Sequence, residues 1–310
     1  MIKRSAAFLL LIATAIILIS GCSGQTSQQE NITFTDASNT PITLTHTPKR
    51  VAVLLSSFAD IWVTAGGTVD ITVCESVSRG FAGKDAILVD EGAGKSIDIE
   101  RLIDAKPDLV IGSADIAAQT DAVVLCRKAG IPAGVFRVEC FEDYLKVLKT
   151  FTNITGNPDR YLQDGVNVQL DIEKAINIYR ASEVKNKILF IRSGASSSSM
   201  KAKTAQDHFA CQMLKELGTV NIADEAPILL DGLSFEEILL QDPDYIFVST
   251  MGDETAAKEF VASVLSQPQW QSLNAVKNAK VYYLPKELFQ FKPNKRWSEA
   301  YQYLIDILEK

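Results

Sequence analysis

Cationic and aromatic side chains occur together at several points of this sequence, a combination that suits an anionic ligand with a flat or apolar body. Arg79 lies two residues before Phe81, and Arg192 ends an apolar run. Aromatic rings cover apolar ligand surface, whereas guanidinium groups form charge-assisted hydrogen bonds to carboxylates. The alternative for each aromatic side chain is ordinary packing in a core. The residues predicted to contact a ligand are Ser57, Phe58, Trp62, Arg79, Phe81, Arg192, Phe289 and Phe291.

Residue patterns that would support catalysis do not occur in the sequence. There is no Gly-x-Ser-x-Gly nucleophile motif, and the serine run at residues 196–199 lacks the glycines and the Gly-Lys-Ser/Thr ending of a phosphate-binding loop. His46 and His208 are the only two histidines, so neither a Ser-His-Asp triad nor a His-rich metal site is expected. We therefore predict a binding protein, with no catalytic residues, no metal site and no cofactor of its own.

The predicted ligand contacts follow short apolar strands, which alternate with amphipathic helices after an expected hairpin at residues 32–45. This alternation is typical of α/β units around mostly parallel sheets. In such sheets the ligand lies beyond the carboxyl ends of the strands. The expected strands are residues 50–55, 70–74, 109–112, 133–138, 187–192, 245–249 and 280–284. The expected helices include residues 58–65, 98–105, 116–129, 141–155 and 207–217.

A helix is expected to join the two halves of the chain. Asn157 can cap a helix that opens with Pro158, and an apolar pattern continues to about Ala181. At 1.5 Å per residue such a helix is roughly 35 Å long, enough to cross from one lobe to another. Because a helix bends far less than a pair of loops, the lobes should move only slightly on binding.

One stretch of sequence recurs in the second half. Residues 96–111 resemble residues 232–247, and each indicates a capped helix with a glutamate in its first turn, a Pro-Asp stop and a strand. The glutamates at the matching positions are Glu100 and Glu236. A carboxylate in the first turn stabilises a helix by about 0.3–1 kcal/mol, which is one reason for its presence.

The first residues indicate export. Lys3 and Arg4 precede an apolar stretch over residues 5–19, which is shorter than the roughly 20 residues of a membrane span. The sequence Ile-Ser-Gly-Cys at residues 19–22 resembles the bacterial lipobox, in which the cysteine is acylated and becomes the first mature residue. We predict a signal peptide over residues 1–21, lipidation of Cys22, a flexible tether over residues 22–31 and a lipid anchor on the extracytoplasmic face of the cell membrane.

Net charge limits the kinds of partner that are expected, and the spacing of the cysteines indicates whether they form disulfides. The formal net charge is −7, and loss of Lys3 and Arg4 with the signal peptide takes it to −9. An acidic balance of this size argues against nucleic acid or anionic lipid as the principal partner. The remaining cysteines form no Cys-x-x-Cys pair, so we interpret them as small buried residues and leave one disulfide open. They are Cys74, Cys126, Cys140 and Cys211.

Taken together, the chain resembles the substrate-binding lipoproteins for iron chelates, haem and cobalamin. The resemblance covers the mature chain from Phe34 and rests on the order and spacing of residues 48–53, 99–110, 234–244, 270–282 and 296–297. It implies two Rossmann-like lobes with mostly parallel sheets, joined by one long helix, and a ligand cleft between the lobes. The boundaries implied are residues 32–156 for the N-terminal lobe, 157–184 for the connecting helix and 185–310 for the C-terminal lobe.

The resemblance also implies a function and a second functional surface. A monomeric binding component would capture an iron-siderophore-type chelate and deliver it to an ABC permease with its ATPase. Glu100 and Glu236 would each meet arginines of that permease, with Glu237 as a one-residue ambiguity. Haem and corrinoids stay open as ligands, because the sequence places no His, Tyr or Met as an axial ligand. A surface lipoprotein without a transport role is the alternative outside the family.

Overall fold

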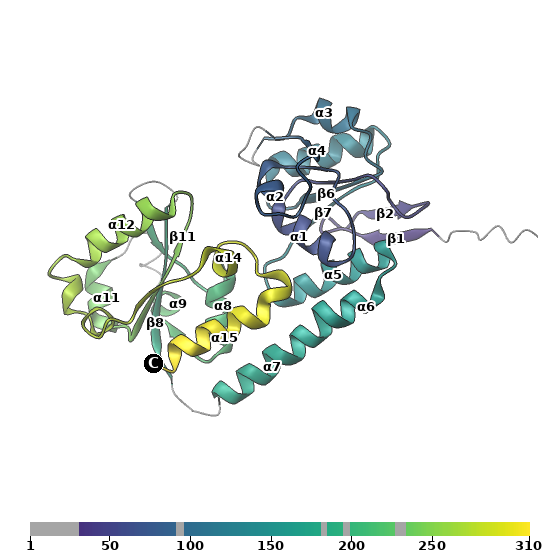
Figure 1. Cartoon of the computed structure of the whole chain (residues 1–310). Coiled ribbons are helices and arrows are strands. Elements are labelled where there is room, and N and C mark those ends of the chain that lie inside the picture. The colour runs from purple at the N-terminus through teal and green to yellow at the C-terminus, as the bar shows by residue number, and fades with distance from the viewer. Residues whose placement is uncertain (1–30, 91–95, 181–184, 195–198, 227–233) are drawn as a thin grey trace, which may run out of the picture.

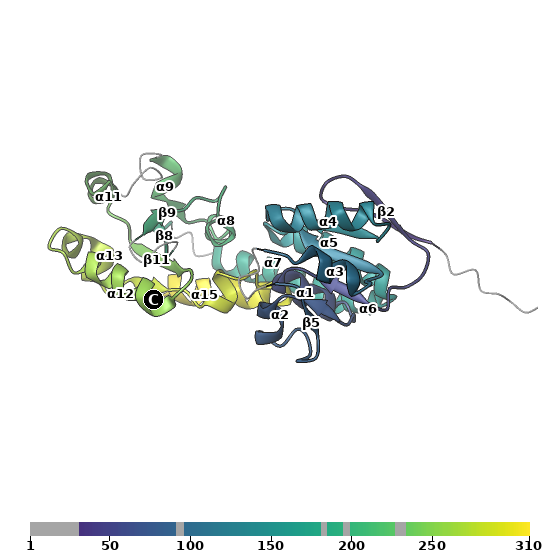
Figure 2. The same ribbon diagram turned by 90° about the horizontal axis from the view of Figure 1, so that it is seen from above.

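Two α/β lobes, joined along one side by helices, make up the part of the chain that the computed structural model describes (Figure 1). That part comprises residues 31–90, 96–180, 185–194, 199–226 and 234–310. Each lobe has a mostly parallel sheet with helices packed around it (Figure 2). The fold class predicted from the alternation of strands and helices is therefore confirmed.

The N-terminal lobe contains a five-stranded parallel sheet in the order β5-β4-β3-β6-β7, and the antiparallel hairpin β1-β2 accompanies it. The chain passes from β3 to β4 on one side and later returns to β6 on the other, so the strand order reverses between β3 and β6. A crevice forms at such a reversal, beyond the carboxyl ends of the strands. The strands are β1 (Ile32–Thr35), β2 (Pro41–Leu44), β3 (Val51–Val53), β4 (Ile71–Thr72), β5 (Ile87–Leu88), β6 (Leu109–Ser113) and β7 (Ala133–Phe136).

Helices α1 to α4 connect successive strands of this lobe, as parallel pairing requires, and α5 follows the last strand. The longest one, α5, buries an apolar stripe of Phe141, Tyr144, Leu148 and Phe151 against the sheet. The helices are α1 (Ser56–Thr64), α2 (Cys74–Ser78), α3 (Ile99–Asp104), α4 (Ala117–Lys128) and α5 (Phe141–Thr155).

The C-terminal lobe repeats this plan with the strand order β10-β8-β11-β12, and β9 pairs antiparallel with β8. Its order reverses between β8 and β11, which gives this lobe a crevice of its own. The strands are β8 (Lys187–Ser193), β9 (Met200–Ala202), β10 (Val220–Asn221), β11 (Tyr245–Thr250) and β12 (Val281–Tyr283). The helical elements are α8 (Phe209–Glu216), α9 (Ile222–Glu225), α11 (Phe235–Gln241), α12 (Glu254–Leu265), η2 (Trp270–Ser272), α13 (Asn274–Lys277), α14 (Lys286–Phe289), η3 (Asn294–Arg296) and α15 (Trp297–Leu308).

The predicted connecting helix is a continuous helical segment with one wider turn. It consists of α6 (Pro158–Tyr161), the π-helical turn η1 (Leu162–Val166) and α7 (Asn167–Arg180), while residues 181–184 lie outside the described residues. The wide turn lies against α5: a Cβ at Gly165 would come within 3.1 Å of the Leu145 side chain. Tyr144 also donates a hydrogen bond to the Asp164 carbonyl at 2.8 Å. The start of the connecting helix is therefore fixed to the N-terminal lobe.

One hydrophobic core cluster includes residues of both lobes. Trp297, at the start of α15, links them: its ring centroid lies 6.1 Å from that of Phe141 and 5.4 Å from that of Phe209, in both cases edge to face. Trp297 is only 1% exposed. Because an apolar interface of this kind opposes free domain motion, the lobes are held in a defined relation.

The sequence repeat is also a structural repeat. Asp108, after α3, accepts hydrogen bonds from the backbone N–H groups of Lys49 and Arg50 at 2.8 and 2.9 Å. Asp244, after α11, accepts one from Lys187 N–H at 2.8 Å. Each Pro-Asp stop therefore fixes the entry to the central strand of its lobe, β3 or β8.

Short elements differ most from the sequence-based expectation. The strand expected over residues 70–74 ends at Thr72, because α2 begins at Cys74, whose N–H is held by Asp90 at 2.8 Å. The four cysteines of the described chain are free thiols, so no disulfide joins them. Burial raises the pKa of Cys126 and of Cys140 to about 11. Within the described ranges, no helix combines the length and apolar character needed to cross a membrane.

Asp36 fastens the N-terminal hairpin to the sheet. One of its carboxylate oxygens accepts from Arg127 at 2.5 Å and from Val135 N–H at 2.9 Å, and the other accepts from Ser38 and Thr40. Burial alone would raise the pKa of Asp36, but these donors outweigh it and the pKa lies below 3.8.

Replacement of Asp36 by Asn should lower the free energy of unfolding by about 1.5–3 kcal/mol, because bonds to a charged acceptor are lost from a buried site. A lowered carboxyl pKa contributes stability that is present above the unfolded pKa and lost as pH falls through the folded pKa. Urea unfolding between pH 2 and pH 7 should therefore show that the free energy of unfolding falls more steeply with decreasing pH in the unmodified protein than in the variant. Equal slopes would assign no such role to Asp36.

Candidate ligand-binding site

A cavity of about 430 Å³ lies between the lobes, at the strand-order reversals of the two sheets. This volume is within the range of small-molecule sites. Its N-terminal wall follows β3, β6 and β7, and its C-terminal wall follows β8 and β12. The lining residues are Leu55, Ser57, Phe58, Ile61, Glu75, Ser113, Asp115, Ile116, Val138, Glu139, Arg192, Gln290, Phe291, Lys292 and Asn294.

The C-terminal wall carries the cations of the cleft. Burial lowers the pKa of Arg192 at the end of β8, and no carboxylate in the described ranges lies within ion-pair distance of it. Burial also lowers the pKa of Lys292, whose ammonium lies 4.7 Å from the centre of the Phe209 ring. Charged groups are rarely buried without an anionic partner. This wall is therefore suited to receive negative charge.

The same cations affect the titration of His208. Its ring packs between Phe190 and Phe209, and Nδ1 accepts a hydrogen bond from Ala210 N–H. Burial, together with the charges of Arg192, Lys292 and Lys203, lowers the pKa of His208 to about 3. His208 is therefore neutral at physiological pH and serves to cap α8.

The N-terminal wall carries carboxylates, each with a partner. Asp115 pairs with Arg137 at 2.6 Å, Glu75 accepts from the Ser56 hydroxyl, and Glu139 reaches across the cleft to Lys292 at 3.4 Å. Glu139 is 58% exposed on its side chain whereas Lys292 is 22% exposed. The cleft therefore has a cationic wall on one lobe and an acidic wall on the other, bridged by an ion pair that water reaches from the carboxylate side.

Arg79 forms a second bridge between the lobes. Its guanidinium donates to Ser56 Oγ at 3.0 Å and pairs with Glu287 of the C-terminal lobe at 3.4 Å. The group lies 3.8 Å from the centre of the Phe291 ring and 4.9 Å from that of Phe81. Cation–π contacts of this kind stabilise by about 0.5–2 kcal/mol.

Asn294 joins the lobes by direct hydrogen bonds. It is fully buried, and its side-chain amide donates to the Ser57 carbonyl at 3.0 Å and to Asp60 at 2.8 Å. Burial raises the pKa of Asp60, and the Asn294 amide and nearby cations offset part of this rise. The backbone of Asn294 is left-handed (φ 52°), a conformation that asparagine tolerates better than most residues.

The eight predicted ligand contacts fall into three groups. Ser57, Phe58, Arg192 and Phe291 line the cleft. Arg79 and Phe81 line a neighbouring cavity of about 470 Å³ that shares Lys292 with the cleft. The structure brings neither Trp62 nor Phe289 to the cleft lining.

Trp62 and Phe289 are core residues. The Trp62 indole is 2% exposed, donates to the Thr68 carbonyl at 2.8 Å and packs edge to face on Phe151. Phe289 is 0% exposed and packs against Tyr303. Both follow a strand in sequence, but the helices that carry them, α1 and α14, turn these rings inward. The bulk of each ring therefore stabilises its lobe.

Sequence reasoning missed Glu75, Glu287 and Asn294. Glu287 lies in α14 and Asn294 in η3, and helical elements of three or four residues are too short to show a hydrophobic period. A weak signal was available in Pro293-Asn294 before a helical run, because both residue types mark turns.

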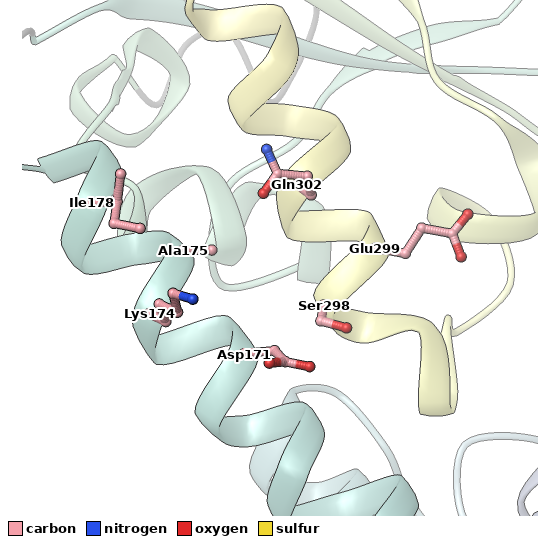
Figure 3. Close-up of a pocket in the computed structure, with 7 residues that line it drawn as sticks. All are labelled: Asp171, Lys174, Ala175, Ile178, Ser298, Glu299 and Gln302. Carbon is pink, nitrogen blue, oxygen red and sulfur yellow. The ribbon is translucent and has the colours of Figure 1, made fainter.

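A third hollow lies away from the strand ends, between α7 and α15. Figure 3 shows Asp171, Lys174, Ala175 and Ile178 on one helix and Ser298, Glu299 and Gln302 on the other, with Glu299 directed away from the first helix. Most of these side chains are polar, and the lining residues include neither the half-buried cations nor the aromatic rings of the cleft. We interpret it as the groove between two packed helices.

The two predicted docking glutamates lie on separate lobes. Glu100 and Glu236 are exposed in the first turns of α3 and α11. These two helices belong to different lobes (Figure 1). Glu237 is partly buried and accepts from Gln241 at 2.9 Å, so Glu236 is the freer carboxylate of the pair. Cys22 lies outside the described residues. Among the described residues, no group of three His, Cys, Asp or Glu side chains could hold a metal ion.

Residues 51–288 match the family described as periplasmic binding protein, and the chain belongs to that family. Similar proteins of Bacillus subtilis (strain 168) include the uncharacterized ABC transporter substrate-binding lipoprotein YvrC, 25% identical over 92% of this chain and 91% of its own. The Fe(3+)-citrate-binding protein YfmC is 24% identical over 89% of this chain and 88% of its own. The family is one of substrate-binding components of ABC transporters.

Solved structures share the fold. Staphylococcus aureus SirA, in its complex with staphyloferrin B, aligns with a TM-score of 0.67 and 19% identity over 89% of this chain and 98% of its own. S. aureus IsdE, in its complex with heme, aligns with a TM-score of 0.68 and 16% identity over 84% of this chain and 99% of its own. The two-lobe architecture is therefore shared with proteins that hold chemically different ligands.

Replacement of Trp62 by Ala should lower the free energy of unfolding by about 3–5 kcal/mol, because a filled core site becomes a cavity. Phe291→Ala is the matched control, since its half-buried ring at the cleft should contribute less than about 2 kcal/mol through its contact with Arg79. Urea unfolding followed by circular dichroism measures both. If Phe291→Ala proved the more destabilising, the assignment of Trp62 to the core would be wrong.

Proposed function

We propose that the chain captures an anionic iron chelate, of the ferric citrate or siderophore type, and presents it to an ABC permease. The observation that carries this proposal is Arg192, a half-buried guanidinium at the end of β8 with no carboxylate of the described chain in pairing distance, which lines the cleft together with Lys292. A carboxylate-bearing ligand would supply the missing partner through charge-assisted hydrogen bonds. The names of YfmC, a Fe(3+)-citrate-binding protein, and YclQ, a petrobactin-binding protein, support this class of ligand.

The acidic wall adds a second element of selectivity. Glu75 and Asp115 offer oxygen acceptors opposite the cations. A chelate with carboxylates on one side and hydroxyl or amine donors on the other matches both walls. Haem is less well supported, because the described residues that line the cleft include no His, Tyr, Met or Cys that could be an axial ligand.

Glu139 would act as an internal competitor of the ligand. It holds Lys292 from the opposite lobe at 3.4 Å and is more than half exposed, so a ligand carboxylate can replace it. Glu287 likewise pairs with Arg79 of the opposite lobe. Their charged groups lie 3.4 Å apart, and the Glu287 side chain is 56% exposed. In this proposal the two glutamates keep the half-buried cations Lys292 and Arg79 paired until the chelate arrives.

Titration with ferric citrate in a calorimeter tests the proposal. Arg192→Ala should weaken binding about 10- to 150-fold, the loss of a hydrogen bond to a charged group. Glu139→Gln should instead tighten binding about 1.5- to 5-fold, since an exposed ion pair contributes roughly 0.2–1 kcal/mol. Lys146→Ala, which removes an exposed cation elsewhere, controls for net charge and should leave the affinity unchanged. A shift of the haem absorption band, with no response to ferric citrate, would overturn the proposal.

We also propose that Cys22 carries the lipid that holds the protein at the membrane. The apolar stretch before it is too short to span a bilayer, and YvrC is named as a lipoprotein. Glu100 and Glu236, exposed on separate lobes, would contact basic side chains of the permease.

Cys22→Ala should leave the protein unprocessed or release it into the medium, because acyl chains supply about 0.8 kcal/mol of membrane affinity per buried methylene. Cys74→Ala, the same exchange within the N-terminal lobe, should remain with the membrane. Cell fractionation followed by immunoblotting measures both. Recovery of Cys22→Ala in the membrane fraction at the mature size would contradict the anchor.

A further inference from the structure

The candidate docking helices α3 and α11 have the same pattern of exposed and buried positions. Both are short, both carry an exposed glutamate in the first turn, and both bury the residue two positions later: Leu102 and Ile238 are each 0% exposed. Both end in a left-handed residue before a proline, Lys106 with φ 51° and Asp242 with φ 42°. Equivalent positions of the two helices can therefore be compared directly.

The two helices differ in the turn that follows the glutamate. Four residues after Glu100 the N-terminal lobe presents Asp104, an exposed carboxylate, and the residue before it is only partly exposed. Four residues after Glu236 the C-terminal lobe presents Leu240, which is 77% exposed. Leu239 beside it is 46% exposed. Residues four apart lie on the same face of a helix, so each glutamate shares its face with the residue that differs.

Leu240 is the most exposed large apolar side chain in the described part of the chain. The packing of α11 does not account for it, because that helix is held by Ile238 in the core and by Phe235, whose ring lies 5.6 Å from that of Trp270. Leu239 and Leu240 therefore form a small exposed apolar patch beside a carboxylate, and exposed apolar patches rimmed by polar groups mark interaction surfaces.

We infer that the two lobes dock on chemically different surfaces, so that the permease accepts this protein in one orientation. The inference rests on the proposed docking function. The N-terminal tip, Glu100 with Asp104, fits a purely basic surface. The C-terminal tip, Glu236 with Leu239 and Leu240, fits an apolar pocket beside a single basic residue. Reversing the protein would place leucines on cations and Asp104 in an apolar pocket, and both mismatches oppose binding.

The two contacts should also respond differently to salt. Ionic strength screens attraction between exposed charges, with a Debye length of about 8 Å at physiological salt. Burial of leucine is not weakened in this way, because the hydrophobic effect does not depend on charge. Added salt should therefore weaken the N-terminal contact and spare the C-terminal one.

The experiment measures association of the mature chain with its permease–ATPase complex in nanodiscs, without any chelate, at low and high salt. Leu240→Asp makes the C-terminal tip resemble the N-terminal one and should weaken association roughly tenfold or more, as loss of an interface anchor does. Asp104→Asn should weaken association only at low salt. Leu170→Asp, the same exchange at a 58% exposed leucine of α7, should have no effect.

Several outcomes would overturn the inference. Wild-type association of Leu240→Asp, or an equal loss in Leu170→Asp, would remove Leu240 from the interface. Loss of a dimer in size-exclusion chromatography, with permease association unchanged, would assign the leucines to a second copy of the chain. Ferric citrate titration of the same preparations is independent of docking. Failure there, with Leu240-dependent association intact, would defeat the ligand proposal and leave the orientation inference standing.

Discussion

Trp297 and the hydrophobic core around it determine how the two lobes face each other. The indole lies between Phe141 of the N-terminal lobe and Phe209 of the C-terminal lobe, and the core cluster continues on both sides. Burial of apolar surface is the dominant favourable contribution to folding, so separation of the lobes would forfeit part of it. The polar contacts of the cleft are formed within this fixed geometry.

The charge distribution of the cleft depends on that geometry. Lys292 and Asn294, just before Trp297 in the chain, reach Glu139, Ser57 and Asp60 on the opposite lobe because Trp297 holds their segment in place. Arg79 belongs to the N-terminal lobe and contacts Glu287 and the Phe291 ring of the C-terminal lobe. The cross-lobe pairs therefore stabilise one relation of the lobes and keep the cations of the cleft oriented.

The sequence was sufficient for the architecture and for part of the site. The strand ends located Arg192 and Ser57, because the position of a ligand beyond the carboxyl ends of parallel strands follows from topology alone. The sequence-based prediction placed Trp62 and Phe289 at the cleft instead of in the core. The side of a short helix that faces the core depends on neighbours distant in sequence. Asn294 and Glu287 were missed for a related reason: their roles come from the opposite lobe, and no local pattern encodes such a contact.

The connecting helix has a further consequence for ligand exchange. Its wide turn is packed on α5 at Gly165, whereas α7 lies beside α15 of the C-terminal lobe (Figure 3). A rotation of the lobes must therefore slide α15 along α7, and shear between packed helices is small. Because the lobes move little, the contacts within the cleft set the dissociation rate of the ligand. Fast release at a membrane partner would require mechanical work on those two helices.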